Sequence, residues 1–389
     1  FEELREKMIE DKDWTRVHGD FPVNDRWIWL NNCGTTPAGR HVVSAVNRFI
    51  SGYAQDGVFT DTASLTGLRR RIKEILAGLL NCRPDELALI HHTAEGMNII
   101  SHGLRFAEGD EVILLENEYP SNIYPWRHLE GKGVILRTAP MGESPEAFFD
   151  GLTRMVGERT RLITLSAVHW CTGMPLPLSE VGALCRERGI DFVVDGAQGV
   201  GMRPIDVAAD GIHFMAFSAW KWLMGPLGLG VLYVARDRLE DLDPVFIGTE
   251  SVVNDTEYLP YKDTLKPTAD RFSISTPGVL DWVYFAASLE YLAEIGFQPV
   301  RERIWDLADR LRDGLSDAGF DLPAGRFPDH RTGIVVCERP GLSAADLVSR
   351  LKEHRITAAE RLGRVRLSPH IYLLPEEIDR AVDVLAGGS

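Results

Sequence analysis

The sequence has few cysteines, no long hydrophobic run and a deficit of positive charge, and each absence excludes a class of protein. Its 389 residues include five cysteines, none in a Cys-x-x-Cys arrangement, so neither a disulfide framework nor a zinc site is indicated. No apolar stretch approaches the roughly 20 residues that cross a bilayer. The net charge of -15 comes from 57 acidic and 42 basic residues and argues against nucleic acid or an anionic membrane as a partner.

The N-terminal segment FEELREKMIEDKDW is charged and lacks the apolar core of a signal peptide. Together with the scattered cysteines, this predicts a reducing, cytoplasmic location. Because the chain begins at Phe1 and not at a methionine, we expect that the natural chain has been trimmed.

The middle of the chain alternates short aliphatic runs with amphipathic helical patterns, such as LSEVGALCRERG, which ends in arginines and a glycine. This repetition predicts an α/β fold with a mainly parallel sheet covered by helices on both faces. The expected strands are DEVILLE, KGVILRT, TRLITLS, IDFVVDG, IHFMAFS and LGVLYVA.

The pattern changes after about Leu265. Two helical stretches, 279–296 and 300–315, precede the short strands GIVVCE and RVRLS and a final helix, EEIDRAVDVLAG. We therefore expect a large domain of residues 21–265 and a smaller α+β domain of residues 1–20 and 266–389.

The strongest chemical signal is an aspartate and a lysine that each follow a buried strand. Asp195 ends the strand in VVDGAQG, and Lys221 lies between two tryptophans in FSAWKW. A turn-capping aspartate and a surface lysine are the ordinary alternatives, but a lysine in such apolar surroundings is rare without a chemical task. A desolvated amine can form a Schiff base with pyridoxal phosphate (PLP), and a buried carboxylate can keep the pyridine nitrogen protonated. The pair therefore predicts PLP as the cofactor.

Six motifs follow one another along the chain: WLNNCGTTP, HHTAEGMNII, ENEYPSNIYPW, VVDGAQG, FSAWKW, and RVRLSPHIY followed by EEID. In this order they resemble the class V aminotransferase branch of the fold-type I PLP enzymes, which includes cysteine desulfurases, isopenicillin N epimerase-like proteins and kynureninases. The resemblance runs from about Trp29 to the end of the chain. It implies the fold-type I architecture, with Lys221 as the Schiff-base lysine and Asp195 at the ring nitrogen.

The resemblance also implies a phosphate site. Thr93 should bind the phosphate together with backbone N–H groups at a helix N-terminus, although a plain helix cap is the alternative for it. Ser218 should add a second hydroxyl group. Two positions depart from the family pattern, because Ala94 replaces a frequent hydroxyl residue and Trp220 replaces a frequent histidine. An indole N–H can donate one hydrogen bond there, but it brings no charge.

Three further residues are expected around the ring of the cofactor. Tyr119 aligns with the family's ring-stacking residue, and Gln198 with a glutamine that hydrogen-bonds near the ring oxygen. His169 falls where relatives place a polar residue close to that oxygen. Packing on the core is the alternative for Tyr119, and a satisfied structural histidine is the alternative for His169.

Arg366 matches the family arginine that binds the substrate α-carboxylate, for which a guanidinium fork is suited. Strand alternation puts Arg364 on the same face, so spacing alone does not choose between them. Thr276 resembles the residue that reaches the phosphate of the neighbouring subunit, although Ser275 replaces the usual glycine before it. The resemblance thus implies a homodimer with shared active sites.

The expected activity is that of a PLP enzyme acting at Cα of an amino acid or amino-acid conjugate, with Lys221 as the base that moves the proton. Transamination comes first, followed by β-elimination at a carbon–sulfur bond and then by epimerisation. Persulfide-forming desulfuration is not expected, because the segment before Arg366 contains no cysteine. Cys33 and Cys171 are better explained as small buried residues.

Two alternatives come from other classes. A catalytically silent PLP-fold scaffold is disfavoured by the presence of Asp195, Gln198, Lys221 and Arg366. A nucleotide-binding α/β enzyme is disfavoured because no GxGxxG or GxxxxGK[ST] motif follows a strand.

Overall fold

The computed structural model describes residues 13–57, 62–323 and 331–387. Residues 1–12 lie outside these ranges. They make up most of the N-terminal segment in which no signal peptide is expected. Within them, no helix has both the length and the apolar character that a membrane span requires. The cytoplasmic location stays a prediction.

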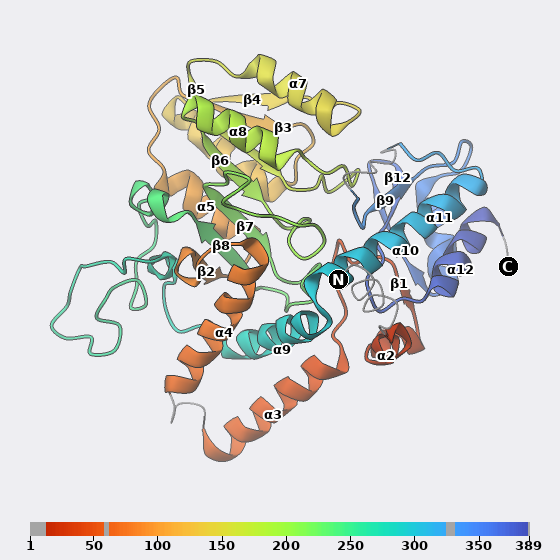
Figure 1. Ribbon diagram of the computed structural model, residues 1–389, viewed down its shortest axis with the longest axis horizontal. Coiled ribbons are helices and arrows are strands. Elements are labelled where there is room, and N and C mark those ends of the chain that lie inside the picture. The colour runs from red at the N-terminus through yellow and green to blue at the C-terminus, as the bar shows by residue number, and fades with distance from the viewer. Residues whose placement is uncertain (1–12, 58–61, 324–330, 388–389) are drawn as a thin grey trace, which may run out of the picture.

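A seven-stranded sheet forms the centre of the molecule (Figure 1). Its strand order is β2-β8-β7-β6-β5-β3-β4, and the five strands from β7 to β4 are parallel, whereas β8 runs antiparallel to both β2 and β7. The strands are β2 (Leu87–Ile90), β3 (Glu111–Leu115), β4 (Ile135–Ala139), β5 (Thr160–Ser166), β6 (Asp191–Asp195), β7 (Phe214–Ser218) and β8 (Gly230–Val234).

The two faces of this sheet are covered by different helices, because successive side chains of a strand point to opposite sides. On β7, for example, Phe214 and Ala216 join one hydrophobic cluster, while Met215 and Phe217 join the other. The helices of the first half are α2 (Trp14–Gly19), α3 (Arg40–Asp56), α4 (Thr62–Leu80), α5 (Thr93–Gly103), α6 (Tyr124–Arg127), α7 (Pro145–Met155) and α8 (Leu178–Arg188). Helices α5 and α6 pack on the first face, and α4, α7 and α8 on the second.

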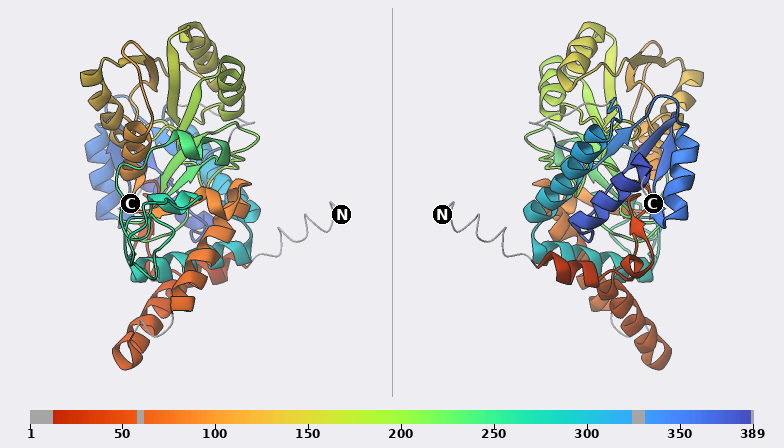
Figure 2. Two further views of the ribbon diagram at one scale, coloured as in Figure 1. Left: turned by 90° about the vertical axis from the view of Figure 1, so that its left-hand side faces the viewer. Right: turned by 90° about the vertical axis from the view of Figure 1, so that its right-hand side faces the viewer.

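The C-terminal part forms its own layer of helices and short strands (Figure 1). β11 (Ala359–Arg361), β12 (Arg364–Leu367) and β9 (Val335–Cys337) make an antiparallel sheet, and β1 (Ile28–Trp29) pairs with β10 (Ile356–Thr357). The helices of this layer are α10 (Phe297–Asp317), α11 (Ala344–Glu353) and α12 (Pro375–Ala386), whereas α9 (Val279–Ile295) packs beside α3 and α4. Figure 2 shows α3 extending away from the body of the molecule.

The predicted α/β fold with a mainly parallel sheet between helices is confirmed, and each of the six expected strands is present. β2 was not expected, and neither was the pairing of β1 with the C-terminal segment. The division into domains at residues 20 and 265 stays a prediction.

Candidate active site

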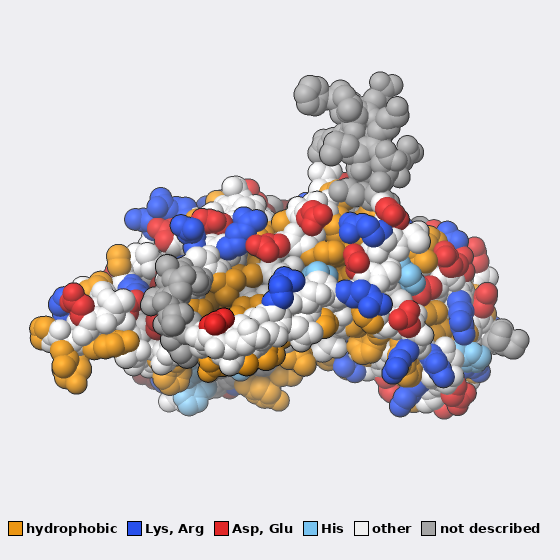
Figure 3. Space-filling view, turned by 90° about the horizontal axis from the view of Figure 1, so that it is seen from below, with side chains coloured by type: hydrophobic (Ala, Val, Ile, Leu, Met, Phe, Trp, Pro, Cys, Tyr) orange, Lys and Arg blue, Asp and Glu red, His pale blue; other side chains and the backbone are white. Residues whose placement is uncertain are grey.

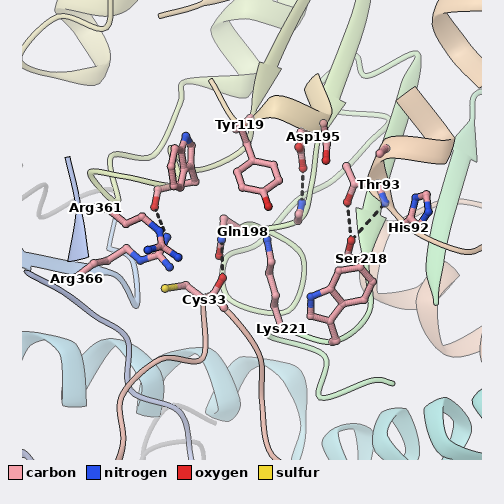
Figure 4. Close-up of a pocket in the computed structure, with 17 residues that line it drawn as sticks. Cys33, His92, Thr93, Tyr119, Asp195, Gln198, Ser218, Lys221, Arg361 and Arg366 are labelled. Atoms are coloured by element: carbon pink, nitrogen blue, oxygen red, sulfur yellow. Dashed lines mark hydrogen bonds between the residues drawn. The ribbon is translucent and has the colours of Figure 1, made fainter. Parts of the chain in front are cut away.

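One cavity of about 320 Å³ lies at the carboxyl ends of the parallel strands (Figure 4). Asp195 is the last residue of β6 and Ser218 is the last residue of β7, while Thr93 begins α5. Lys221 follows β7, and all four residues line the cavity. The fold therefore brings the central residues of the sequence prediction together at the sheet edge where α/β proteins bind ligands.

Asp195 and Lys221 are electrically coupled inside this cavity. Burial raises the pKa of Asp195, and the charge of Lys221 opposes that shift. Burial lowers the pKa of Lys221, and the charge of Asp195 opposes that shift in turn. Desolvation thus favours a neutral amine on Lys221, which is the nucleophilic and basic form of the side chain.

The N-terminus of α5 and the end of β7 meet through two hydroxyl groups. The backbone N–H of Thr93 donates to Ser218 Oγ over 3.3 Å, and the two hydroxyl oxygens are 2.8 Å apart. Ala94 and Trp220 also line the cavity. Hydroxyl groups at the positive end of an 11-residue helix suit a phosphate group.

The ring of Tyr119 lies close to the Lys221 amine. Its ring centroid is 5.5 Å from Lys221 Nζ, and Figure 4 shows the amine pointing toward the tyrosine. The ring of Trp170 packs edge-on against Tyr119, with centroids 5.3 Å apart. An aromatic ring held in this way can restrain a planar ligand over Lys221.

The Gln198 amide is oriented by its neighbours. Its nitrogen donates to the Cys33 carbonyl over 2.9 Å, and its oxygen accepts from the indole N–H of Trp222 over 3.0 Å. One N–H of the amide is therefore left for a ligand in the cavity, because an amide nitrogen carries two hydrogens.

Arg366 is the arginine that enters the cavity from the C-terminal sheet. Its side chain is buried, Nη1 donates to the Trp170 carbonyl over 2.7 Å, and Nε has no hydrogen-bond partner among the described residues. Arg364, the alternative left open by strand alternation, instead pairs with Glu338 over 2.9 Å and does not line the cavity. An unpaired buried guanidinium nitrogen is costly unless a ligand satisfies it.

Two predicted residues do not line this cavity. His169 is buried, and its ring bonds the Asn117 carbonyl over 3.1 Å and the Thr172 hydroxyl over 3.0 Å. Burial lowers the pKa of His169 to about 4. Thr276 lines a second cavity of about 200 Å³, which Arg69 and Asp281 also line. The roles predicted for these two residues stay predictions.

Other residues of the cavity were not found from the sequence. His92, Ser166, Trp170 and Arg361 line it, and so does Cys33, which sequence reasoning treated as a packing residue. Trp170 follows His169 directly in the sequence, and its side chain lines the cavity, whereas that of His169 does not. Arg361 pairs with Arg364 across the β11–β12 hairpin, and no sequence signal marks its orientation.

The residues present fit PLP. The hydroxyl groups and helix N-terminus at Thr93 and Ser218 suit its phosphate, and the buried carboxylate of Asp195 suits a protonated ring nitrogen. Lys221 supplies an amine in the same cavity, and the guanidinium group of Arg366, which also lines it, suits the carboxylate of a substrate. Among the described residues, no group of three or more acidic, cysteine or histidine side chains is arranged to hold a metal ion.

Comparison with known proteins agrees with this geometry. The family model described as aminotransferase class V matches residues 28–370. The chain belongs to this family. The family is PLP-dependent, in agreement with the cofactor expected from the sequence.

Relatives within the family carry different activities. The chain is 28% identical over 388 residues to a probable cysteine desulfurase of Pyrococcus abyssi, covering 95% of this chain and 96% of the relative. It is 31% identical over 396 residues to isopenicillin N epimerase of Streptomyces clavuligerus, covering 96% of this chain and 98% of the relative. A solved structure of a C-DES variant, with glycine covalently linked to its PLP cofactor, matches with a TM-score of 0.88 at 24% identity, covering 96% of this chain and 99% of that one. These matches confirm the family and the fold-type I architecture.

Proposed function

We propose that this chain is a PLP-dependent enzyme that acts at Cα of an α-amino acid, and that its reaction is transamination. The observation that carries the proposal is that the Lys221 amine shares one cavity with a buried carboxylate, Asp195, and lies 5.5 Å from the ring centroid of Tyr119. When bound, PLP supplies an electron sink for the charge that develops at Cα.

The residues of the chain divide the remaining work. Thr93 and Ser218 bind the phosphate, Asp195 holds the proton of the ring nitrogen, and Tyr119 packs on the ring. Arg366 orients the substrate through its α-carboxylate, since its guanidinium group lines the cavity. Lys221 carries the cofactor and, once released, takes the Cα proton as a neutral amine, which its lowered pKa favours.

A single lysine in the cavity supports transamination, whereas His92 and Cys33, which also line it, are the groups that epimerisation would use as a second acid. Lys221 is the single amine among the described residues that line the cavity. Transamination returns a proton with the same base that removed it, whereas epimerisation needs a second acid on the opposite face. Tyr119 occupies that side of Lys221 with an aromatic ring.

β-Elimination at a carbon–sulfur bond is the second candidate. Relatives named cysteine desulfurase support it, as does the thiol of Cys33, which lines the cavity and accepts a hydrogen bond from Ser368 Oγ over 3.1 Å. Desulfuration through a persulfide is not proposed. β11 and β12 are joined by a tight turn at Leu362 and Gly363, so this segment forms no long loop. The segment also contains no cysteine.

We also propose that two copies of the chain form the working enzyme. Thr276 does not line the cavity of Lys221 in its own chain, which suits a residue that serves a partner subunit. Large hydrophobic side chains are exposed in the segment of residues 245–261. Figure 3 shows hydrophobic groups near α3 and at the left end of the face that it draws. The exposed residues of the segment are Val245, Phe246, Ile247, Val253, Tyr258, Leu259 and Tyr261.

The reaction is tested by incubating the PLP-loaded protein with amino acids, with and without a keto acid. Transamination predicts a keto product only when the acceptor is present. Keto acid and a released thiol without an acceptor would identify the lyase instead, and inverted amino acid alone would identify an epimerase. A loaded protein that converts no amino acid would support the silent scaffold and contradict the proposal.

A further inference from the structure

Glu118 is a buried carboxyl group that no step of the proposed function uses. It follows β3, and 5% of its surface is exposed. The parallel strands β5 and β6 end at Ser166 and Asp195, and Glu118 lies three residues beyond the end of the adjacent strand β3 at Leu115. The three residues therefore follow one another along the same edge of the sheet. Ser166 and Asp195 are register partners and both line the cavity, whereas Glu118 lies behind Ser166 and Tyr119.

The chain holds this carboxyl group in place with four donors. Oε2 accepts from the backbone N–H of Ser166 over 2.7 Å and from the Asn122 amide over 3.4 Å. Oε1 accepts from the backbone N–H of Tyr119 over 2.7 Å and from the Ser166 hydroxyl over 2.5 Å. Glu118 therefore fixes the backbone of the two residues that lie on either side of the expected ring position.

Glu118 has no cationic partner among the described residues. Burial raises the pKa of Glu118 to about 7, the charge of Asp195 raises it further, and the hydrogen bonds from Ser166 and Tyr119 oppose these effects. The other titratable group that faces Glu118 is Cys171, a thiol whose pKa burial raises to about 12. Two coupled carboxyl groups at one edge of the cavity form an anionic site that a single cation can satisfy.

We propose that Glu118 is a positioning residue that shares with Asp195 the task of holding a protonated ring nitrogen. This inference rests on the proposed function. Among the described residues no hydrogen bond joins the two carboxyl groups, so Asp195 acts on Glu118 through its charge. A protonated aromatic nitrogen held against Asp195 would favour the ionised form of Glu118, whose proton would pass to water. Both carboxylates then face one cation.

The test is the pH titration of the visible absorption band of the PLP-loaded protein, combined with the ¹⁵N NMR signal of bound ring-labelled PLP. Glu118→Gln keeps the shape and removes the charge. It should lower the midpoint of the band titration by about one pH unit and move the ¹⁵N signal toward that of the unprotonated ring. Glu116→Gln is the matched control, because it makes the same change at an exposed position in the same segment and should leave both signals unchanged.

A second variant keeps the test valid if Glu118→Gln does not fold. Ser166→Ala removes one donor from Glu118, so more of the carboxyl stays protonated and the midpoint should shift in the same direction by less. Unchanged midpoints in the folded variants, with the wild-type ¹⁵N signal, would overturn the role of Glu118. If the wild-type protein itself develops no visible band with PLP, it is the proposed function that fails.

Discussion

The Thr93 N–H donates to Ser218 Oγ, and the two hydroxyl oxygens are 2.8 Å apart, which joins the first turn of α5 to the last residue of β7. These residues are far apart in the sequence and come from adjacent parts of the sheet edge. Their contact fixes one end of the cavity before any ligand binds. A preorganised pair of this kind loses little conformational entropy on binding.

Removing either hydroxyl should weaken PLP binding. Thr93→Val and Ser218→Ala should each raise the dissociation constant of PLP about tenfold, because a hydrogen bond to a charged phosphate is lost. The binding is measured by equilibrium dialysis or by the visible band. Thr153→Val is the control, since its hydroxyl bonds the Phe149 carbonyl of its own exposed helix. Equal affinities in all three variants would argue against a phosphate at this position.

Arg366 should matter for the substrate and not for the stability of the chain. Arg366→Leu should raise KM for an amino acid on the order of 100-fold, since the bidentate contact with the α-carboxylate is lost. The unfolding temperature should stay close to that of the wild type, because the variant removes a buried guanidinium whose Nε is unsatisfied. Arg366→Lys keeps the charge and should give an intermediate KM. A fall in unfolding temperature with an unchanged KM would assign Arg366 a structural role.

The packing of α5 on β7 should not tolerate a side chain at Gly96. A Cβ atom there would lie 2.4 Å from Cβ of Ala216 and 2.9 Å from Cδ1 of Ile90. Gly96→Ala should therefore lower the free energy of unfolding by about 2–3 kcal/mol and weaken PLP binding by displacing Thr93. Gly78→Ala is a suitable control, because a Cβ there meets no atom within 4 Å. Urea denaturation of both variants measures the difference.

Acid should destabilise the fold through buried histidines. Burial lowers the pKa of His41 and His169 to about 4 and that of His370 to about 3. The unfolded chain takes up protons on these residues below pH about 6.5, whereas the folded chain does not. The free energy of unfolding should therefore be highest above that pH and should fall as the pH drops toward about 4.

His41→Phe tests this pH dependence at a site remote from Lys221. The two ring nitrogens of His41 have no hydrogen-bond partner among the described residues, and its ring stacks on Tyr291 with centroids 4.0 Å apart. Phenylalanine keeps the stacking and removes the titration, so the variant should lose less stability than the wild type between pH 7 and pH 5. An equal loss of unfolding free energy in the variant and the wild type over this pH range would contradict the assignment of this pH dependence to His41.

Much of the fold could be predicted because the six strands of the α/β core are apolar runs long enough to be distinct. β2 was missed because LALI is a short run beside the more prominent motif HHTAEGMNII. The pairing of β1 with β10 joins residues more than 300 positions apart, and no local pattern encodes such a contact.

Sequence motifs could predict which residues meet in the cavity, as for Asp195, Ser218 and Lys221. The orientation of a side chain could not be predicted where it depends on tertiary contacts. Strand alternation could not separate Arg364 from Arg366, whereas the ion pair with Glu338 does. His169 turns toward the Asn117 carbonyl and leaves Trp170 at the cavity, a choice set by a partner 52 residues away in the sequence.

The central claim is that Lys221 carries the cofactor, and chemical trapping tests it most directly. The protein is incubated with PLP, reduced with borohydride, digested and analysed by mass spectrometry. A stoichiometric pyridoxyl group on Lys221, absent from a Lys221→Ala variant, is the predicted result. A pyridoxyl group on exposed lysines such as Lys132 or Lys352, with Lys221 unmodified, would contradict the account.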